Sequence, residues 1–255
     1  MTRPYVLTEA NWAAIRKTQF DVAVLPWGAT EAHNYHLPYG TDNIQCDHIA
    51  AESARIAWEA GKNVIVLPTV PFGVNNQQTD IPCTINMSPT TQLAVLADAV
   101  ASLEEQGIPR LVVMNGHGGN CFKQMIRQLQ SSTSVLLCQL NWYDALSLED
   151  HFEAPGDHAD EMETSLMMHL APGLVLPLSE AGDGSTNAFK LRAFREKWAW
   201  APRQWTSATN DTGSGDPATA TPEKGAAFFK ALTEKIATFF VELADADPAD
   251  LYEKP

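Results

Sequence analysis

The sequence has few basic residues, few cysteines and no long apolar run. Its 255 residues include 17 Lys and Arg against 31 Asp and Glu, a formal net charge of -14 at pH 7. Nucleic-acid backbones and anionic membranes usually bind basic patches, so this balance argues against both as partners. No run approaches the roughly 20 apolar residues of a membrane span, and residues 1–17 lack the apolar core of a signal peptide. We therefore expect a cytoplasmic protein.

The cysteines argue against a disulfide framework and against a zinc ribbon. The chain has four, far apart and in no CxxC pair: Cys46, Cys83, Cys121 and Cys138. We expect them to be reduced and mostly structural.

Composition and hydrophobic patterning predict one α/β domain. Hydrophobic residues make up 45% of the chain, which is enough to bury a large core. Runs rich in Val, Ile and Leu predict strands buried on both faces at residues 22–25, 64–67, 111–114 and 135–140. Helical patterns cover residues 47–59, 89–105, 122–129, 161–170 and 223–243. This alternation favours a three-layer α/β/α fold with a mainly parallel sheet.

Ligands bind such sheets at the carboxyl ends of the strands, where two polar loops are expected. The loop after the first strand carries Glu31, His33, His36 and Asp42. The loop after the third strand reads Asn-Gly-His-Gly-Gly-Asn and places His117 among glycines, which leave room for a ligand. A phosphate-binding turn is the alternative, but neither GxGxxG nor a GK[ST] ending is present.

A third polar segment, residues 156–165, carries His158, Glu161 and Glu163 at the start of a predicted helix. Acidic residues in a first turn also favour the helix dipole, which is a purely structural explanation. Any one of these segments alone could be a solvated loop. Three such segments in a chain with seven histidines point instead to a metal site of carboxylate and imidazole ligands.

Residues 181–222 are rich in Gly, Ser, Thr, Asn and Trp, without sustained periodicity. The segment is too long for an ordinary connection. We expect a lid, a subunit contact or a mobile segment.

Taken together, the motifs resemble the creatininase-like amidohydrolase family, over most of the chain. They are residues 28–33, 36–38, 41–42, 115–120, 158–165, 215–217 and 223–225. The resemblance implies one amidohydrolase domain over residues 1–255, a homo-oligomer (trimer or hexamer) and two divalent metal ions per chain, Zn, Mn or Fe. The implied metal ligands are Glu31, His33, Asp42, His117 and Glu161, with Asp42 bridging the two ions.

Two positions depart from the family pattern. Creatininase takes a ligand glutamate from the second position after the motif histidine, which is Gly119 here, so the resemblance assigns Glu161 in its place. The family commonly has Gly after the loop histidine, where this chain has Asn34. The missing glutamate favours a cyclic amide, formamide or small amide other than creatinine as the substrate.

The implied reaction is hydrolysis of a non-peptide C–N bond in a small-molecule amide by a metal-bridging hydroxide. The predicted catalytic residues are His158, which would pass a proton to the leaving nitrogen, and Glu161. Glu163 could orient His158 or cap its helix, and we favour the capping role; we expect His36 to hold its loop. The predicted pocket walls are Asn75, Trp142 and residues 198–205.

Two alternative functions stay open at this point. One is a metallopeptidase that acts on a small peptide with the same site chemistry. The other is a catalytically silent, metal-bound binding subunit.

Overall fold

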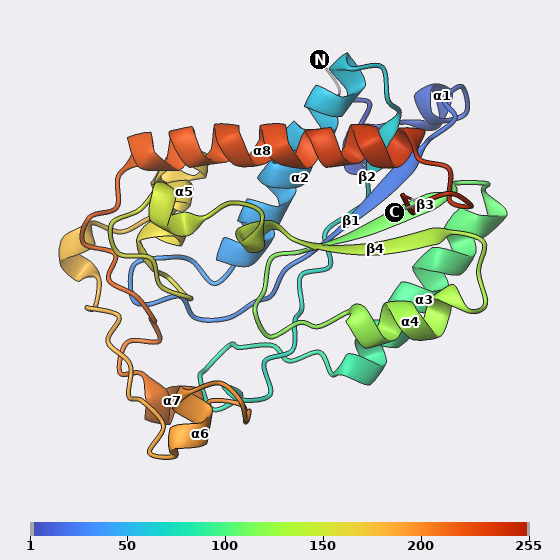
Figure 1. The fold of residues 1–255 in the computed structure, drawn as a ribbon. Helices are drawn as coiled ribbons and strands as arrows, with labels where there is room; N and C mark the ends of the chain where they lie inside the picture. Colours follow the sequence, from blue (N-terminus) through green and yellow to red (C-terminus); the bar gives the residue numbers. More distant parts are fainter. Residues whose placement is uncertain (1–2, 254–255) are drawn as a thin grey trace.

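Four parallel strands form the centre of the computed structural model, which describes residues 3–253 (Figure 1). The strands are β1 Val22–Trp27, β2 Val64–Val66, β3 Arg110–Asn115 and β4 Leu136–Asn141. Their order across the sheet is β2-β1-β3-β4, and each neighbouring pair is parallel. These are the four predicted runs, with their ends shifted by one or two residues.

Helices connect and cover the strands. The longer helices are α2 Thr41–Glu59, α3 Pro89–Glu105, α4 Lys123–Gln130, α5 Glu161–Leu170 and α8 Pro222–Asp245. The short helices are α1 Trp12–Ile15, α6 Arg192–Arg195 and α7 Trp205–Ala208. Single 3₁₀ turns are Leu7–Glu9, Trp142–Asp144, Leu148–Asp150, Pro172–Leu174 and Leu178–Glu180. Within residues 3–253, none of the helices has the length and hydropathy of a membrane span.

Both faces of the sheet are covered, because alternate strand residues point to opposite sides. Val22 and Val24 pack into a core with α2, α5 and α8. Ala23 and Leu25 pack into a second core with α3 and α4. Figure 1 shows α8 running along one side of the molecule and α3 and α4 on the other. The predicted three-layer α/β/α architecture is confirmed.

The helix predicted at residues 47–59 begins earlier, at Thr41. Residues 41–46 carry no apolar periodicity, so the hydrophobic pattern missed this first part. Asp42 therefore lies in the first turn of α2, where the helix dipole favours a carboxylate.

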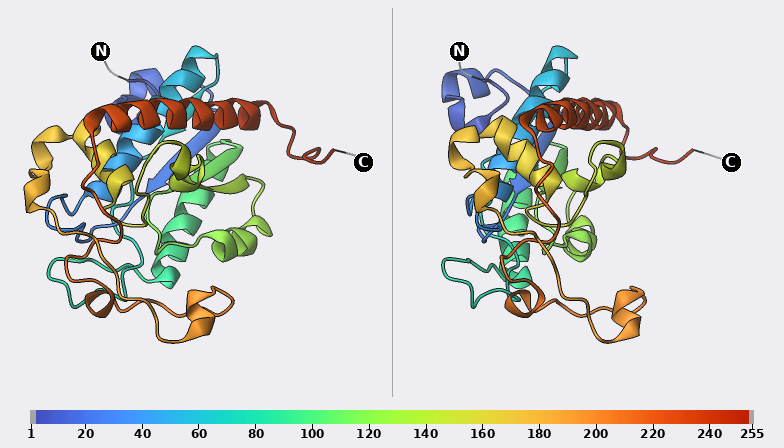
Figure 2. Two further views of the ribbon diagram at one scale, coloured as in Figure 1. Left: turned by 60° about the vertical axis from the view of Figure 1, so that its left-hand side comes forward. Right: turned by 90° about the vertical axis from the view of Figure 1, so that its left-hand side faces the viewer.

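The segment 181–222 is mostly irregular and carries α6 and α7, which lie at the opposite end of the molecule from α8 (Figure 2). Parts of it are tied to the polar loops. Asn34 exchanges side-chain hydrogen bonds with the backbone of Gly182, at 3.1 and 2.8 Å. His158 pairs with Ser214 in an antiparallel bridge. These contacts place the segment beside the loops predicted to carry the chemistry.

The four cysteines are free, as predicted. Cys46 is buried in the core between α2 and the sheet, whereas Cys83 and Cys121 are exposed. None takes part in the clusters described below.

Candidate metal centre

Six titratable side chains meet in one buried cluster at the carboxyl ends of β1 and β3. All six are buried: Glu31, His33, Asp42, His117, His158 and Glu163. The loop after β1 supplies two of them, α2 one and the loop after β3 one, while His158 comes from the loop that leads into α5 and Glu163 from the first turn of α5. Segments far apart in the sequence thus meet at one point, as expected for a parallel sheet.

The cluster contains three candidate ligand sets. Two of them share Asp42: one is Glu31, Asp42 and His117, and the other is His33, Asp42 and Glu163. The third is Glu31, His33 and His158. Within each set, one nitrogen or oxygen atom per residue lies within 4.8 Å of those of the other two. Asp42 Oδ1 lies 2.8 Å from His33 Nε2, and Asp42 Oδ2 lies 3.2 Å from His117 Nδ1. Each set combines imidazole with carboxylate, the donor types that hold divalent metal ions in proteins.

The histidine tautomers support this interpretation. Nδ1 of His33 lies 3.1 Å from the Glu31 carbonyl, and Nε2 of His117 lies 3.1 Å from the Val74 carbonyl. Because a carbonyl can only accept, each of these nitrogens carries the proton. The other nitrogen of each ring faces the carboxylates of the cluster and becomes a ligand when a cation replaces its proton. Metal-binding histidines are commonly oriented by such a backbone bond.

The buried histidines and carboxylates of the cluster shift one another's pKa values. Burial would lower the pKa of His33, but the adjacent Asp42 carboxylate raises it to about 10. Burial would raise the pKa of Asp42, but His33 and His117 hold it well below its usual range. Burial, only partly offset by His33, raises the pKa of Glu163 to about 8. Protons on the imidazoles thus balance buried carboxylates, and divalent cations could take their place.

Asp42 Oδ2 is a fully buried oxygen of the cluster that makes no hydrogen bond within residues 3–253. Its close polar neighbour is His117 Nδ1, at an ion-pair distance of 3.2 Å. A buried carboxylate oxygen is rarely left without a partner. A bound cation would satisfy it.

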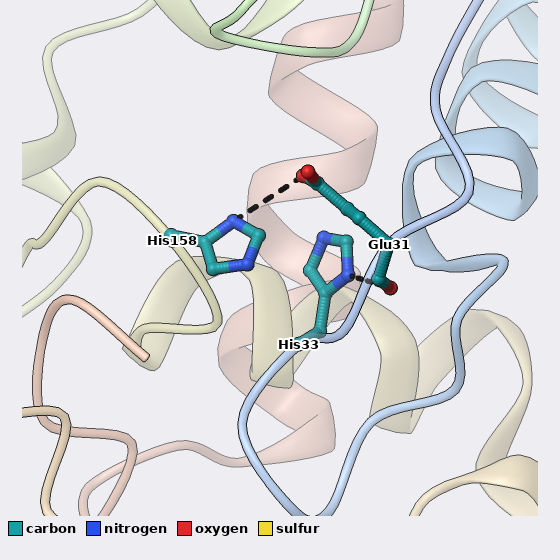
Figure 3. Close-up of side chains that lie close together, drawn as sticks. All are labelled: Glu31, His33 and His158. Atoms are coloured by element: carbon teal, nitrogen blue, oxygen red, sulfur yellow. Dashed lines mark hydrogen bonds and ion pairs between the residues drawn. The ribbon is translucent and has the colours of Figure 1, made fainter. Parts of the chain in front are cut away.

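His158 lies next to Glu31 and His33, with which it forms the third candidate ligand set (Figure 3). Its Nε2 lies 2.8 Å from the Ala32 carbonyl and must therefore carry a proton. Its Nδ1 lies 3.7 Å from Glu31 Oε1, the interaction drawn in Figure 3. Burial, reinforced by the neighbouring His33, lowers the pKa of His158. This ring is therefore a neutral imidazole with its free nitrogen facing the cluster.

Glu161 does not reach the cluster, in contrast to the prediction. Its carboxylate accepts from the amides of Glu153 and Ala154, at 2.8 and 2.7 Å, and from Lys224 Nζ at 2.5 Å. This ion pair ties the start of α5 to α8 and lowers the pKa of Glu161 against the effect of burial. Glu163, two residues later, occupies the place expected for Glu161.

Glu163 also performs the capping role expected of it. Its Oε2 accepts from the Ala159 amide at 2.5 Å, while Asp160 caps the same helix by accepting from the Glu163 amide at 3.0 Å. Asp160 and Glu163 thus each accept from a backbone amide at the start of α5. Capping and the helix dipole explain an acidic residue at a helix start and say nothing about a second role for the glutamate.

Gly119 is the position where this chain lacks the ligand glutamate of creatininase, and the surrounding atoms explain why it is a glycine. A Cβ at this position would lie 2.3 Å from the Val74 carbonyl oxygen and 2.5 Å from His117 Nε2. A side chain there would collide with the bond that orients His117. In this backbone conformation, glycine at 119 is therefore required by the packing around His117.

The other departure, Asn34, keeps the conformation that a glycine would adopt. Its φ is 52°, in the left-handed region that Asn tolerates better than most residues. Its side-chain oxygen accepts from the Tyr35 amide at 2.6 Å, which fixes the turn. The loop that carries His33 can thus turn without glycine.

The remaining predicted residues have mixed outcomes. His36 bonds to Thr164 of α5 at 2.9 Å and so fastens the first loop, as predicted. Trp200 and Trp205 line a cavity beside the cluster. Trp142 packs inside the core and Asn75 bonds to the backbone of Ile85, so neither lines the cavities at the cluster. Both were wrong as pocket walls.

Known proteins that are similar to this chain include creatininases and a peptidase. The creatininase family model, described as creatinine amidohydrolase, matches residues 8–240. A crystal structure from Bacteroides fragilis, provisionally described as a creatinine amidohydrolase, is 44% identical with a TM-score of 0.92, covering 99% of this chain and 100% of that one. The mycofactocin precursor peptide peptidase of Mycolicibacterium smegmatis is 28% identical over 82% of this chain and 79% of its own length.

A creatininase mutant in a Zn–Zn form has the same fold. Its TM-score is 0.78 at 22% identity, covering 95% of this chain and 99% of that one. At that identity the likeness concerns the fold.

Proposed function

This chain belongs to the creatininase family of metal-dependent amidohydrolases, and from that premise we propose that it is a dinuclear enzyme hydrolysing a non-peptide C–N bond in a small cyclic amide or formamide. The observation that carries the proposal is the sharing of Asp42 between two ligand sets. Glu31, Asp42 and His117 would hold one ion, and His33, Asp42 and Glu163 the other. The donor set suits Zn, Mn or Fe.

Two divalent ions held there would supply a water of lowered pKa and polarise the substrate carbonyl. The protein groups around them supply orientation and exclude solvent. Gln78 donates to Glu31, and the Ala159 amide donates to Glu163, so both carboxylates are fixed before a ligand arrives. Such fixed outer bonds usually raise metal affinity.

We assign proton transfer to His158. Its Nε2 proton is committed to the Ala32 carbonyl at 2.8 Å, so Nδ1 is free to take a proton and pass it to the leaving nitrogen. The lowered pKa keeps the ring neutral and able to accept. Trp205 packs against this ring in a T-shaped arrangement, with ring centroids 5.2 Å apart, and limits its rotation. Glu161, the other predicted catalytic residue, is better explained as a structural ion pair with Lys224.

A substrate panel tests the reaction class. Protein reconstituted with Zn²⁺ or Mn²⁺ is incubated with cyclic amides, formamides and short peptides, and products are followed by mass spectrometry. Ring opening or deformylation supports the proposal. Cleavage of peptides alone would favour a metallopeptidase, the activity named for the mycobacterial relative. Metal binding without any hydrolysis would favour the silent binding subunit. A homo-oligomeric state and a cytoplasmic location stay predictions.

A further inference from the structure

Two cavities border the buried cluster, with volumes of about 240 and 360 Å³. The residues common to both are Glu31, His117, Gly118, Asp157, His158 and Arg203. Arg203 is the one Lys or Arg among the residues that line them. A permanent cation at the mouth of an otherwise acidic site requires an explanation.

Packing fixes the position of this guanidinium. It lies over the Trp205 ring, 4.6 Å from the centroid. Trp205 is itself buried, and its indole N–H donates to the Thr212 carbonyl at 3.1 Å. The same indole also contacts His158 in a T-shaped arrangement, with ring centroids 5.2 Å apart. Arg203 is thus held at the wall of both cavities, where a ligand can reach its guanidinium.

The present partner of Arg203 is weakly held. Its Nη2 donates to Asp157 Oδ2 at 2.9 Å, and the two side chains are 37% and 55% exposed. Exposed ion pairs of this kind contribute little to stability. A guanidinium has five N–H donors, and within residues 3–253 Asp157 takes one of them. The bond to Asp157 thus shows that a carboxylate can bind Arg203 at the cavities while most of the guanidinium N–H donors stay available.

We propose that Arg203 binds a carboxylate of the substrate, which displaces Asp157. The substrate would be a small amide that carries this carboxylate away from the scissile C–N bond. Planar N–H donors match a carboxylate in a way that a neutral group cannot reproduce. This inference rests on the proposed function, whose cluster would hold the scissile group beside His158. Arg203 is a specificity residue in this scheme and takes no part in bond breaking.

Equilibrium binding with matched probes tests the inference. The probes are dihydroorotate, a cyclic amide with a carboxylate, and its neutral methyl ester, with N-formylglycine and N-formylglycinamide as a second pair. Dissociation constants are measured by titration calorimetry on the metal-reconstituted protein, in a His158→Asn background that limits turnover. The acid of at least one pair should bind about tenfold more tightly than its neutral partner, equal to roughly 1.4 kcal/mol.

Substitutions separate substrate binding from a merely structural ion pair. Arg203→Gln should remove the preference for the acid and leave the neutral probe unchanged, and Arg203→Lys should restore part of it. Asp157→Asn should tighten binding of the acid, because the internal competitor loses its charge. Arg192→Gln is the charge-matched control, since Arg192 lies in the same segment, is 80% exposed and pairs with Glu196. It should change nothing.

The contrary outcomes are distinct. Equal affinity for acid and neutral probes, no binding of either acid, or an equal loss for both probes in Arg203→Gln would overturn the role of Arg203. Failure of the reconstituted enzyme to hydrolyse any amide, with acid preference intact, would overturn the proposed function instead. Hydrolysis of neutral amides as efficient as that of acids would overturn the carboxylate inference alone.

Discussion

Two glutamates at the start of α5 should respond in opposite ways to the same substitution. Glu163 lies in a ligand set, whereas Glu161 is paired with Lys224. We predict that Glu163→Gln removes one metal ion per chain and leaves the apo fold intact. Glu161→Gln should keep both ions and weaken the fold.

The expected magnitude for Glu163 follows from its pKa of about 8, against an ordinary value of 4.5. Folding at pH 7 therefore requires this buried carboxyl to take up a proton. One pKa unit corresponds to about 1.4 kcal/mol, so the penalty at pH 7 is on the order of 3 kcal/mol. It is absent below about pH 4.5, where both states are protonated, and grows until about pH 8. A glutamine mimics the protonated form, so apo Glu163→Gln should be at least as stable as the parent chain.

The effect on Glu161 has the opposite sign. Its carboxylate is buried and accepts two backbone hydrogen bonds and one from Lys224. Glutamine would lose the charge and part of this pattern, at about 1–3 kcal/mol. For a chain of this size that lowers Tm by roughly 3–10 °C. The metal ligands are untouched, so the content should stay near two ions per chain.

The assays are plasma mass spectrometry after reconstitution and desalting, and thermal unfolding of the apo proteins. Glu223→Gln is the matched control, because Glu223 is an exposed glutamate in the first turn of α8. It should change neither quantity. Loss of metal in Glu161→Gln with two ions retained in Glu163→Gln would refute the reasoning, because Glu161 would then have to reach the site.

Three further predictions concern the same site. Gly119→Ala would place a Cβ 2.3 Å from the Val74 carbonyl oxygen and disturb the bond that orients His117, so the metal affinity should fall about tenfold or more. Competition with a chelator measures this affinity. Gly118→Ala is the control and should leave the affinity unchanged, because a Cβ there would have no atom within 4 Å. His158→Asn should lower kcat by about 10²–10⁴-fold with unchanged metal content; an equal loss of metal would contradict a role in proton transfer alone. Because the pKa of Glu163 is about 8 in the metal-free cluster, metal binding at pH 7 should release protons, and the metal affinity should rise as the pH approaches 8. Calorimetry in buffers of different ionisation enthalpy measures both effects. A metal affinity that does not depend on pH would contradict the raised pKa of Glu163.

The sequence alone determined the fold class and most of the cluster. Short Val- and Ile-rich runs bury on both faces only in a covered parallel sheet, so the three-layer architecture followed from residues such as Val22 and Val64. Polar loops after the strands must then meet at one edge of the sheet. That rule and the family motifs together located Glu31, His33 and His117, which the structure brings into one cluster.

Only the tertiary structure decided which acid of α5 faces the cluster. Residues 161 and 163 are both acidic, both lie in the first helical turn and are both favoured there by the dipole. At about 100° per residue they point some 200° apart, so the rotation of the helix about its axis chooses between them. That rotation is set by packing on α8, where Lys224 holds Glu161 and close contact at Gly225 fixes the distance. Likewise, Trp205 packs with Ala32 and Ile81 and against His158, which are far away in the sequence. This long-range packing brings Arg203, two residues before Trp205, to the cavities, and no local pattern in the sequence specifies it.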